Sequence, residues 1–217
     1  MSVLLCAATG MEVSPTVQMM AKQNFSGKVD LLITGVGLMA ATYALTKQIA
    51  QKKPAIIVQA GISGCLDEAL SLGEVVVVKN EAIGDMGVME NDSFKTLFEL
   101  NLIQKDEQPW QNGKLVNTHN NLLFLTGLKQ VQAVSVHEIT TNEKRIQYYK
   151  ESLKAQIEHM EGAALHFVGL MEGIPFLQIR CISNLVSVRD KTKWKLDESI
   201  TNLNNELQKI INELIKE

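Results

Sequence analysis

The sequence is short of cysteine and of net charge, and each shortage excludes a class of protein. Its three cysteines, Cys6, Cys65 and Cys181, are odd in number and widely spaced, which predicts buried reduced thiols rather than disulfides or a metal site. The net charge of −3 lacks the basic excess typical of nucleic-acid-binding proteins. No apolar run approaches the roughly 20 residues that a membrane span needs, and the chain begins without the features of a signal peptide. We therefore expect a cytoplasmic protein with no membrane or nucleic-acid partner.

Several signatures of catalysis and cofactor binding are also missing. The sequence contains no P-loop, no Gly-x-Ser-x-Gly elbow and no cluster of cysteine and histidine. The segment Gly35–Ala40 fits the dinucleotide fingerprint Gly-x-Gly-x-x-Ala, but the next predicted strand ends at Gln59–Gly61 without the acidic residue that binds the ribose of NAD. We therefore expect no cofactor and no metal, and we interpret Gly35–Ala40 as a tight turn that approaches a small ligand.

Apolar segments alternate with helical patterns along the whole chain. The predicted strands are Val3–Ala8, Val29–Thr34, Ala55–Ala60, Val75–Val78, Val131–Val136 and Pro175–Ile182, and the predicted helices are Leu38–Lys52, Asn142–Lys154, Met160–Glu172 and Leu196–Leu214. The middle of the chain, about 85–127, is typical of loops around a short helix at 93–100. With no internal repeat and no linker, this order predicts a single domain over residues 1–217. Its fold class is α/β, a three-layer α/β/α sandwich around a mixed central β-sheet.

Three polar side chains near predicted element boundaries each have a structural and a functional interpretation. Glu12 follows the first strand and is either a solvated carboxylate or a general base. Glu161 lies at an apolar, small-residue helix start, where it either interacts with the helix dipole or accepts hydrogen bonds from the 2′ and 3′ hydroxyls of a ribose. Asn184 follows a strand and is either a turn residue or a source of two N–H donors for the N7 and O6 acceptors of a 6-oxopurine.

A second glycine-bearing segment, Gly61–Leu66, also follows a predicted strand. Because open α/β sheets bind ligands at the carboxyl ends of their strands, we expect Gly35–Ala40 and Gly61–Leu66 to line one pocket. Two ordinary turns would produce the same pattern. Together with Glu12, Glu161 and Asn184, these segments outline a site for a ribose and a purine.

Six segments of the chain occur in the same order in one superfamily of enzymes. They are Glu12-Val13, Thr34–Leu38, Ala60–Gly64, Leu72–Val77, Met160–Ala164 and Arg180–Asn184. On these segments the chain resembles the nucleoside phosphorylase and nucleosidase superfamily, which includes methylthioadenosine/S-adenosylhomocysteine nucleosidase and purine nucleoside phosphorylase. Within it, Ser183-Asn184, Arg189-Asp190 and Trp194 look most similar to the futalosine hydrolases, which release hypoxanthine from futalosine in menaquinone biosynthesis.

The resemblance implies a role for eight residues. Glu12 would be the general base that activates water, and Asn184 would stabilise the leaving purine. The substrate contacts would be Met160 on the sugar face, Glu161 on the ribose hydroxyls, Arg180 as the residue that orients the carboxylates, and Ile62, Gly64 and Ile139. Ile139 would replace the aromatic residue on which adenine nucleosidases stack the base. The resemblance also implies a homo-oligomer, and Arg189 or Lys193 as a cationic partner for the substrate tail.

The choice of substrate depends on Asn184. Adenine-cleaving relatives have Asp at this position, whereas an amide can donate to both acceptors of hypoxanthine. A methylthioadenosine/S-adenosylhomocysteine nucleosidase is therefore the less favoured alternative. A purine nucleoside phosphorylase is disfavoured because the carboxylate of Glu12 would repel phosphate. A nucleoside-binding protein without catalysis would not need both Glu12 and Glu161.

Overall fold

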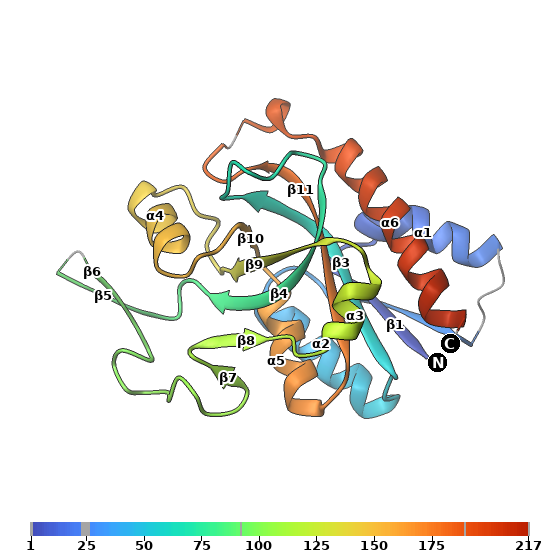
Figure 1. Cartoon of the computed structure of the whole chain (residues 1–217), viewed down its shortest axis with the longest axis horizontal. Helices are drawn as coiled ribbons and strands as arrows, with labels where there is room; N and C mark the ends of the chain where they lie inside the picture. Colours follow the sequence, from blue (N-terminus) through green and yellow to red (C-terminus); the bar gives the residue numbers. More distant parts are fainter. Residues whose placement is uncertain (1, 23–26, 92, 189, 217) are drawn as a thin grey trace.

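A mixed nine-stranded β-sheet occupies the centre of the protein, and helices cover both of its faces (Figure 1). The computed structural model describes residues 2–22, 27–91, 93–188 and 190–216. The sheet strands are β1 (Val3–Ala7), β2 (Val29–Ile33), β3 (Ile56–Cys65), β4 (Val75–Ile83), β7 (Trp110–Gln111), β8 (Lys114–Val116), β9 (Lys129–Ser135), β10 (Ile157–His159) and β11 (Phe176–Leu185). A separate hairpin joins β5 (Gly87–Glu90) to β6 (Ser93–Thr96).

The helices are α1 (Gly10–Lys22), α2 (Leu38–Gln51), α3 (Asn120–Leu125), α4 (Glu143–Glu151), α5 (Gly162–Glu172) and α6 (Leu196–Lys216), with a short 3-10 helix, η1, at Lys191–Lys193. Within the described ranges, no helix combines the length and the apolar character needed to cross a membrane.

The long strand β3 organises the sheet because it pairs with different neighbours along its length. It is parallel to β1 and β11, and its final residues are antiparallel to β10. β11 also pairs with β4, β4 with β9, and β9 with β10, so the strands β3, β11, β4, β9 and β10 form a closed ring. Because β1, β3 and β11 run in the same direction, their carboxyl ends lie at one edge of the sheet, where α/β folds bind ligands.

Strand β1 contributes to an apolar core on each face of the sheet, as its uninterrupted apolar sequence requires. Val3, Leu5 and Ala7 join the core that is covered by α1, α3 and α6, whereas Leu4 and Cys6 join the core covered by α2 and α5. This division follows from the two-residue period of a strand, which directs alternate side chains to opposite faces. The buried residues that the helices add are Val13, Leu123, Leu203, Leu207, Ile210, Ile211 and Leu214 on the first face and Leu45, Ile49, Leu165 and Val168 on the second.

The predicted α/β/α architecture is confirmed, and so is the burial of all three cysteines. The strands and helices predicted outside residues 85–127 are all present, with small changes at their ends. The helix predicted at 93–100 is wrong, because Ser93–Thr96 pairs as a strand with β5. The alternative interpretation of Gly61–Leu66 as an ordinary turn is wrong, because β11 and β10 extend the pairing of β3 as far as Cys65.

Helix α1 and strand β10 are among the elements that the sequence-based prediction lacks. Helix α1 buries only Glu12, Val13 and Thr16, so its apolar stripe is weak. Strand β10 has only three residues and is formed by its pairing with β3 and β9 rather than by its own sequence.

Helix α5 buries a histidine against the sheet. His166 is fully buried, and its Nδ1 donates to the carbonyl oxygen of Leu115 at 3.0 Å. Its ring lies 4.6 Å from that of Phe176. Burial lowers the pKa of His166 from 6.5 to about 4, against the opposing attraction of Glu81. The folded protein therefore keeps this ring neutral at pH values where the unfolded chain would protonate it.

This pKa difference predicts that the protein loses stability as the pH falls from about 6.5 towards 4, since the unfolded state binds the extra proton. The full shift corresponds to roughly 3 kcal/mol, because each pKa unit is about 1.4 kcal/mol. We expect His166→Asn, which keeps a donor at the position of Nδ1, to reduce the difference in unfolding free energy between pH 7 and pH 5. Urea unfolding at both pH values measures this, with exposed His137→Asn as the control. An unchanged pH dependence in His166→Asn would contradict the assignment.

Candidate active site

A cavity of about 300 Å³ opens at the edge of the sheet where β1, β3 and β11 end. Seven of the eight residues predicted for the site lie in its wall, namely Glu12, Ile62, Gly64, Ile139, Met160, Glu161 and Asn184. The eighth, Arg180, lies behind the wall. The carboxylates of Glu12 and Glu161 therefore share one cavity although about two thirds of the chain separates them. The other lining residues are Ala8, Thr9, Met11, Val36, Ser63, Thr140, Glu158, His159, Ser183, Val186, Ser187, Val188, Trp194, Leu196 and Ile200.

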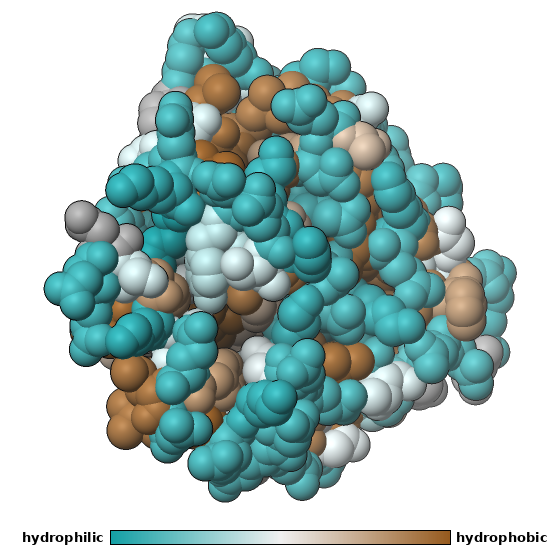
Figure 2. Space-filling model, turned by 60° about the vertical axis from the view of Figure 1, so that its left-hand side comes forward, coloured by the Kyte–Doolittle hydropathy of each residue, from teal (hydrophilic) through white to brown (hydrophobic). Residues whose placement is uncertain are grey.

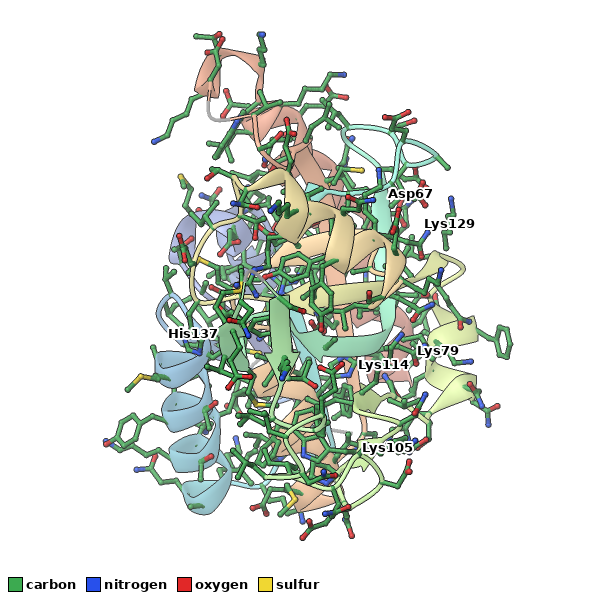
Figure 3. All side chains as sticks on the ribbon, turned by 90° about the vertical axis from the view of Figure 1, so that its left-hand side faces the viewer. Asp67, Lys79, Lys105, Lys114, Lys129 and His137 are labelled. Carbon is green, nitrogen blue, oxygen red and sulfur yellow. The ribbon has the colours of Figure 1, made fainter. Side chains whose placement is uncertain are left out.

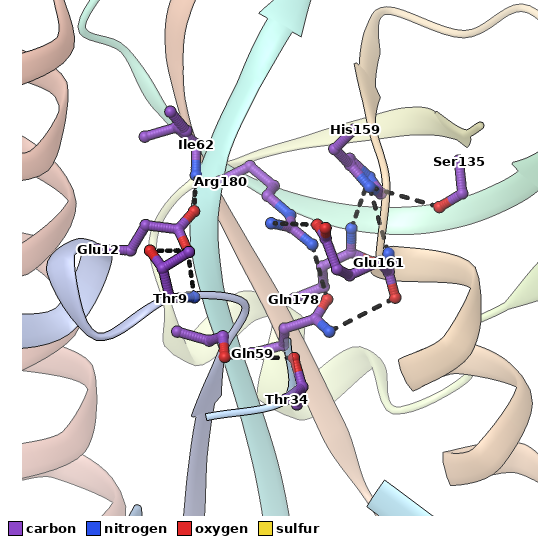
Figure 4. A network of polar contacts seen from close by, with 12 residues as sticks. Thr9, Glu12, Thr34, Gln59, Ile62, Ser135, His159, Glu161, Gln178 and Arg180 are labelled. Carbon is purple, nitrogen blue, oxygen red and sulfur yellow. Dashed lines mark hydrogen bonds and ion pairs between the residues drawn. The ribbon is translucent and has the colours of Figure 1, made fainter. Parts of the chain in front are cut away.

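The carboxylate of Glu12 is buried and held by three hydrogen bonds (Figure 4). Its Oε2 accepts from the backbone N–H of Thr9 at 3.0 Å and from the Thr9 hydroxyl at 3.1 Å. This contact caps helix α1, because Glu12 is the third helical residue and Thr9 precedes the first. Oε1 accepts from the backbone N–H of Ile62 on β3 at 3.2 Å. The interpretation of Glu12 as a solvated carboxylate is therefore wrong, because its side chain is fixed in the cavity wall.

Glu161 occupies the N-cap position of α5 and is only 6% exposed. Its Oε1 accepts from the backbone N–H of Gly37 at 3.0 Å, and its Oε2 lies 3.8 Å from Nη1 of Arg180. Gly37 has a φ of 92° and Gly35 a φ of 80°, a left-handed conformation that favours glycine. The glycines of the segment Gly35–Ala40 thus allow a turn that directs an N–H group at a carboxylate, in agreement with its interpretation as a tight turn.

Arg180 is 1% exposed and does not line the cavity, so its predicted contact with substrate is not present in the structure. Its Nη2 donates to Oε1 of Gln59 at 2.7 Å. A Cβ atom on Gly61 would lie 2.1 Å from Nη1 of Arg180 and 2.9 Å from Oε1 of Glu12. Because Gly61 has no side chain, the guanidinium fits between the carboxylates of Glu12 and Glu161. Its positive charge compensates their negative charges there.

Asn184 lies near the end of β11, immediately after an irregularity in its pairing with β3. Such bulges redirect a side chain from the alternation of the strand. The Ser183 hydroxyl donates to Oδ1 of Asn184 at 2.8 Å, and Nδ2 donates to the carbonyl of Leu185 at 2.9 Å. A Cβ atom on Gly64 would lie 2.9 Å from Val186 and 3.5 Å from Nδ2 of Asn184, so this glycine leaves room beside the amide.

Apolar side chains form the remaining walls of the cavity. Ile139 and Met160 line it, and Trp194 lines it near Val188, whose carbonyl accepts from the indole N–H at 2.9 Å. Trp194 is thus part of the cavity wall rather than of a solvated loop.

No lysine or arginine lines the cavity among the residues that the structure describes. Lys79, Lys105, Lys114 and Lys129 lie on the side of the molecule away from α2 (Figure 3). Of the two cations expected for the substrate tail, Lys193 is exposed and outside the lining, and Arg189 lies outside the described residues.

Two cavity residues, Glu158 and His159, were not expected from the sequence. Both belong to β10, whose alternation directs them to opposite sides. Nδ1 of His159 accepts from the backbone N–H of Gly162 at 3.2 Å, and its Nε2 lies 2.8 Å from Nε2 of Gln178 and 3.2 Å from Oε2 of Glu81. Ser135 donates to the other oxygen of Glu81 at 3.1 Å. Although burial opposes it, contact with His159 holds the pKa of Glu81 below its usual range. This buried cluster fixes the turn that carries Glu161.

Comparisons with known proteins identify the superfamily of the chain. The profile of the Phosphorylase superfamily matches residues 24–216. The chain belongs to this superfamily. It is 26% identical to the futalosine hydrolase of Thermus thermophilus, with 84% of this chain and 80% of that protein covered. It is also 26% identical to the futalosine hydrolase of Streptomyces coelicolor, with coverage of 83% and 77%.

Solved structures of the superfamily have the same fold. A futalosine hydrolase mutant of Helicobacter pylori superimposes with a TM-score of 0.79 at 17% identity, covering 98% of this chain and 99% of the other. A methylthioadenosine/S-adenosylhomocysteine nucleosidase of H. pylori, solved with butyl-thio-DADMe-Immucillin-A, has a TM-score of 0.80 at 16% identity and 98% coverage of both chains.

The close approach at Gly61 leads to a test of the site's construction. We expect Gly61→Ala to lower the unfolding free energy by roughly 1–3 kcal/mol, because its methyl group would overlap the buried guanidinium of Arg180. The matched control is Gly10→Ala, at the start of α1, where a Cβ atom would meet nothing within 4 Å. Urea unfolding compares the two variants. Equal stability of Gly61→Ala and Gly10→Ala would show that Arg180 is not held in this position.

Proposed function

We propose that the protein hydrolyses the N-glycosidic bond of futalosine and releases hypoxanthine, as one nucleosidase domain acting in menaquinone biosynthesis. The observation that carries the proposal is the meeting of two buried carboxylates, Glu12 and Glu161, with the amide of Asn184 in one cavity. The names of the relatives from T. thermophilus and S. coelicolor support the choice of futalosine.

Glu161 is suited to hold the ribose. Hydroxyl groups donate hydrogen bonds, and an ionised carboxylate has about four acceptor sites on its two oxygens. The Gly37 N–H occupies one of these sites, and Arg180 balances the charge from the protein side. The 2′ and 3′ hydroxyls would use the remaining sites, with the side chain of Met160 against the sugar.

Glu12 is the proposed general base. As the glycosidic bond lengthens, C1′ gains the character of an oxocarbenium ion, and an attacking water must lose a proton. The hydrogen bonds from Thr9 and Ile62 keep the carboxylate of Glu12 oriented. Asn184 would donate to N7 and O6 of the departing hypoxanthine once its Nδ2 releases the carbonyl of Leu185, since an amide has two N–H donors.

The charge in the cavity wall favours water over phosphate as the nucleophile. Three carboxylate side chains line the cavity, those of Glu12, Glu158 and Glu161, and within the described part of the chain no lysine or arginine does. The guanidinium of Arg180, behind the cavity wall, is turned toward Glu161 and Gln59. A phosphate dianion would therefore meet repulsion from Glu12 without compensation.

We further propose that the protein is a cytoplasmic homo-oligomer. Apolar side chains are exposed beside the cavity mouth, with exposures of 60% for Met11, 59% for Val36, 81% for Met39 and 67% for Tyr43. Figure 2 shows that hydrophobic residues gather locally on a mostly hydrophilic surface, on the face that it displays. An apolar patch beside a site is typical of a protein interface. The three cysteines are buried and none forms a disulfide, which is typical of proteins of a reducing compartment.

The decisive assay incubates the protein with futalosine, inosine, methylthioadenosine or adenosine, with and without phosphate, and measures the free base. We expect hypoxanthine from futalosine without phosphate. For Glu12→Gln we expect kcat to fall by roughly 10²–10⁴-fold with little change in KM, because the base is lost and the contacts with sugar and purine remain. The exposed Glu68→Gln is the control. Near-normal turnover of Glu12→Gln would contradict the role of Glu12.

A second variant tests the recognition of the base. Asn184→Asp replaces an N–H donor by an acceptor, which would face the O6 lone pairs of hypoxanthine. We expect kcat/KM for futalosine to fall by about tenfold to a hundredfold, corresponding to the ~1–3 kcal/mol of an unpaired polar contact. The ratio of adenosine to inosine cleavage should rise. An unchanged ratio would remove Asn184 from base recognition.

A further inference from the structure

The buried carboxylate of Glu158 is not used by the mechanism proposed above. Glu158 lies on β10 opposite Gly64 of β3, is 6% exposed, and lines the cavity together with Thr140, Asn184 and Val186. Its position therefore faces the part of the cavity where Asn184 would hold the purine.

One oxygen of this carboxylate has a partner and the other has none. Oε1 of Glu158 accepts from the backbone N–H of Thr140 at 3.1 Å. Oε2 is buried and has no hydrogen-bond partner among the described residues. Buried carboxylate oxygens are usually satisfied, so an unpaired one beside a cavity indicates a donor that arrives with the ligand.

The bond to Thr140 also changes the hydrogen-bonding character of the cavity wall. Without Glu158, the Thr140 N–H would be free to donate to a ligand in this part of the cavity. With Glu158 in place, that donor is occupied, and an acceptor is available instead. This reversal matters for the choice of base, because N1 is an N–H donor in hypoxanthine and a lone-pair acceptor in adenine.

We propose that Glu158 is a specificity-determining residue, whose free oxygen accepts the N1–H of a 6-oxopurine. This inference rests on the proposed function and adds to it. Asn184 would donate to O6 and N7, and Glu158 would accept from N1–H, so the two residues together match the edge of hypoxanthine. Adenine would place the N1 lone pair against the carboxylate. Burial raises the pKa of Glu158 against the lowering effect of its hydrogen bonds with Thr140, in keeping with an environment that lacks compensating charge.

The test measures binding of free bases by calorimetry, with hypoxanthine, 1-methylhypoxanthine and adenine as probes. The methyl group of 1-methylhypoxanthine removes only the N1–H. For the wild-type protein we expect hypoxanthine to bind at least tenfold more tightly than either of the other bases. In Glu158→Gln that preference should fall to less than threefold, because an amide whose oxygen accepts from Thr140 would present its NH2 donor to the N1–H donor of the base. Glu158→Met, which frees the Thr140 N–H, should bind adenine more tightly than wild type does. The exposed Glu138→Gln is the matched control.

A structural role for Glu158 would have a different signature. The raised pKa means that the charged form is disfavoured in the folded protein, so Glu158→Gln should melt at or above the wild-type temperature. A lower melting temperature with an equal loss of affinity for all three bases would overturn the proposal, as would an unchanged preference for hypoxanthine.

The outcome also separates this inference from the proposed function. If the wild-type protein cleaves futalosine but Glu158→Gln keeps the full preference for hypoxanthine over 1-methylhypoxanthine, the inference fails and the function stands. If the wild-type protein cleaves no nucleoside but shows a preference for hypoxanthine that depends on Glu158, the proposed hydrolysis fails and the inference stands.

Discussion

The ion pair between buried Arg180 and Glu161 is the interaction on which the site depends. A cavity wall with carboxylates from distant segments is unstable unless a positive charge compensates them, and burying one charge without a partner is strongly destabilising. Arg180 supplies that charge from behind the wall, 3.8 Å from Glu161 and beside the Gly61 backbone that Glu12 also approaches. Because the guanidinium is withdrawn from the cavity, it stabilises the carboxylates without offering an anion site to a phosphate.

Backbone N–H groups complete this arrangement. The carboxylate of Glu12 accepts from Thr9 and from Ile62, and that of Glu161 accepts from Gly37. The donors belong to loops or strands at the carboxyl ends of β1, β2 and β3, which the parallel pairing brings together. The sheet therefore positions the reacting groups through its backbone, and side-chain flexibility contributes little to their placement.

The strands and helices that could be predicted from the sequence are those whose hydrophobic pattern lies within their own residues. The uninterrupted apolar run of β1 and the three- and four-residue spacing of leucine and isoleucine in α6 each indicate burial without reference to any other part of the chain. Strand β10 and the hairpin of β5 and β6 are different, because their residues become strands only through partners elsewhere. The sequence also left open whether Gly61 and Gly64 form an ordinary turn, because glycine is typical of turns; in the structure they allow close contacts of a strand with Arg180 and Val186.

The sequence by itself determined the layered α/β architecture, the superfamily to which the chain belongs, and the identity of the acidic and amide side chains available for chemistry. It did so because hydrophobic periodicity and short motifs are local properties of a chain. Only the tertiary structure decided that Glu12 is held rather than solvated, that Arg180 stands behind the wall, and that an oxygen of Glu158 lacks a partner. Burial and hydrogen-bond satisfaction are properties of residues that are distant in sequence and close in space, and no local pattern records them.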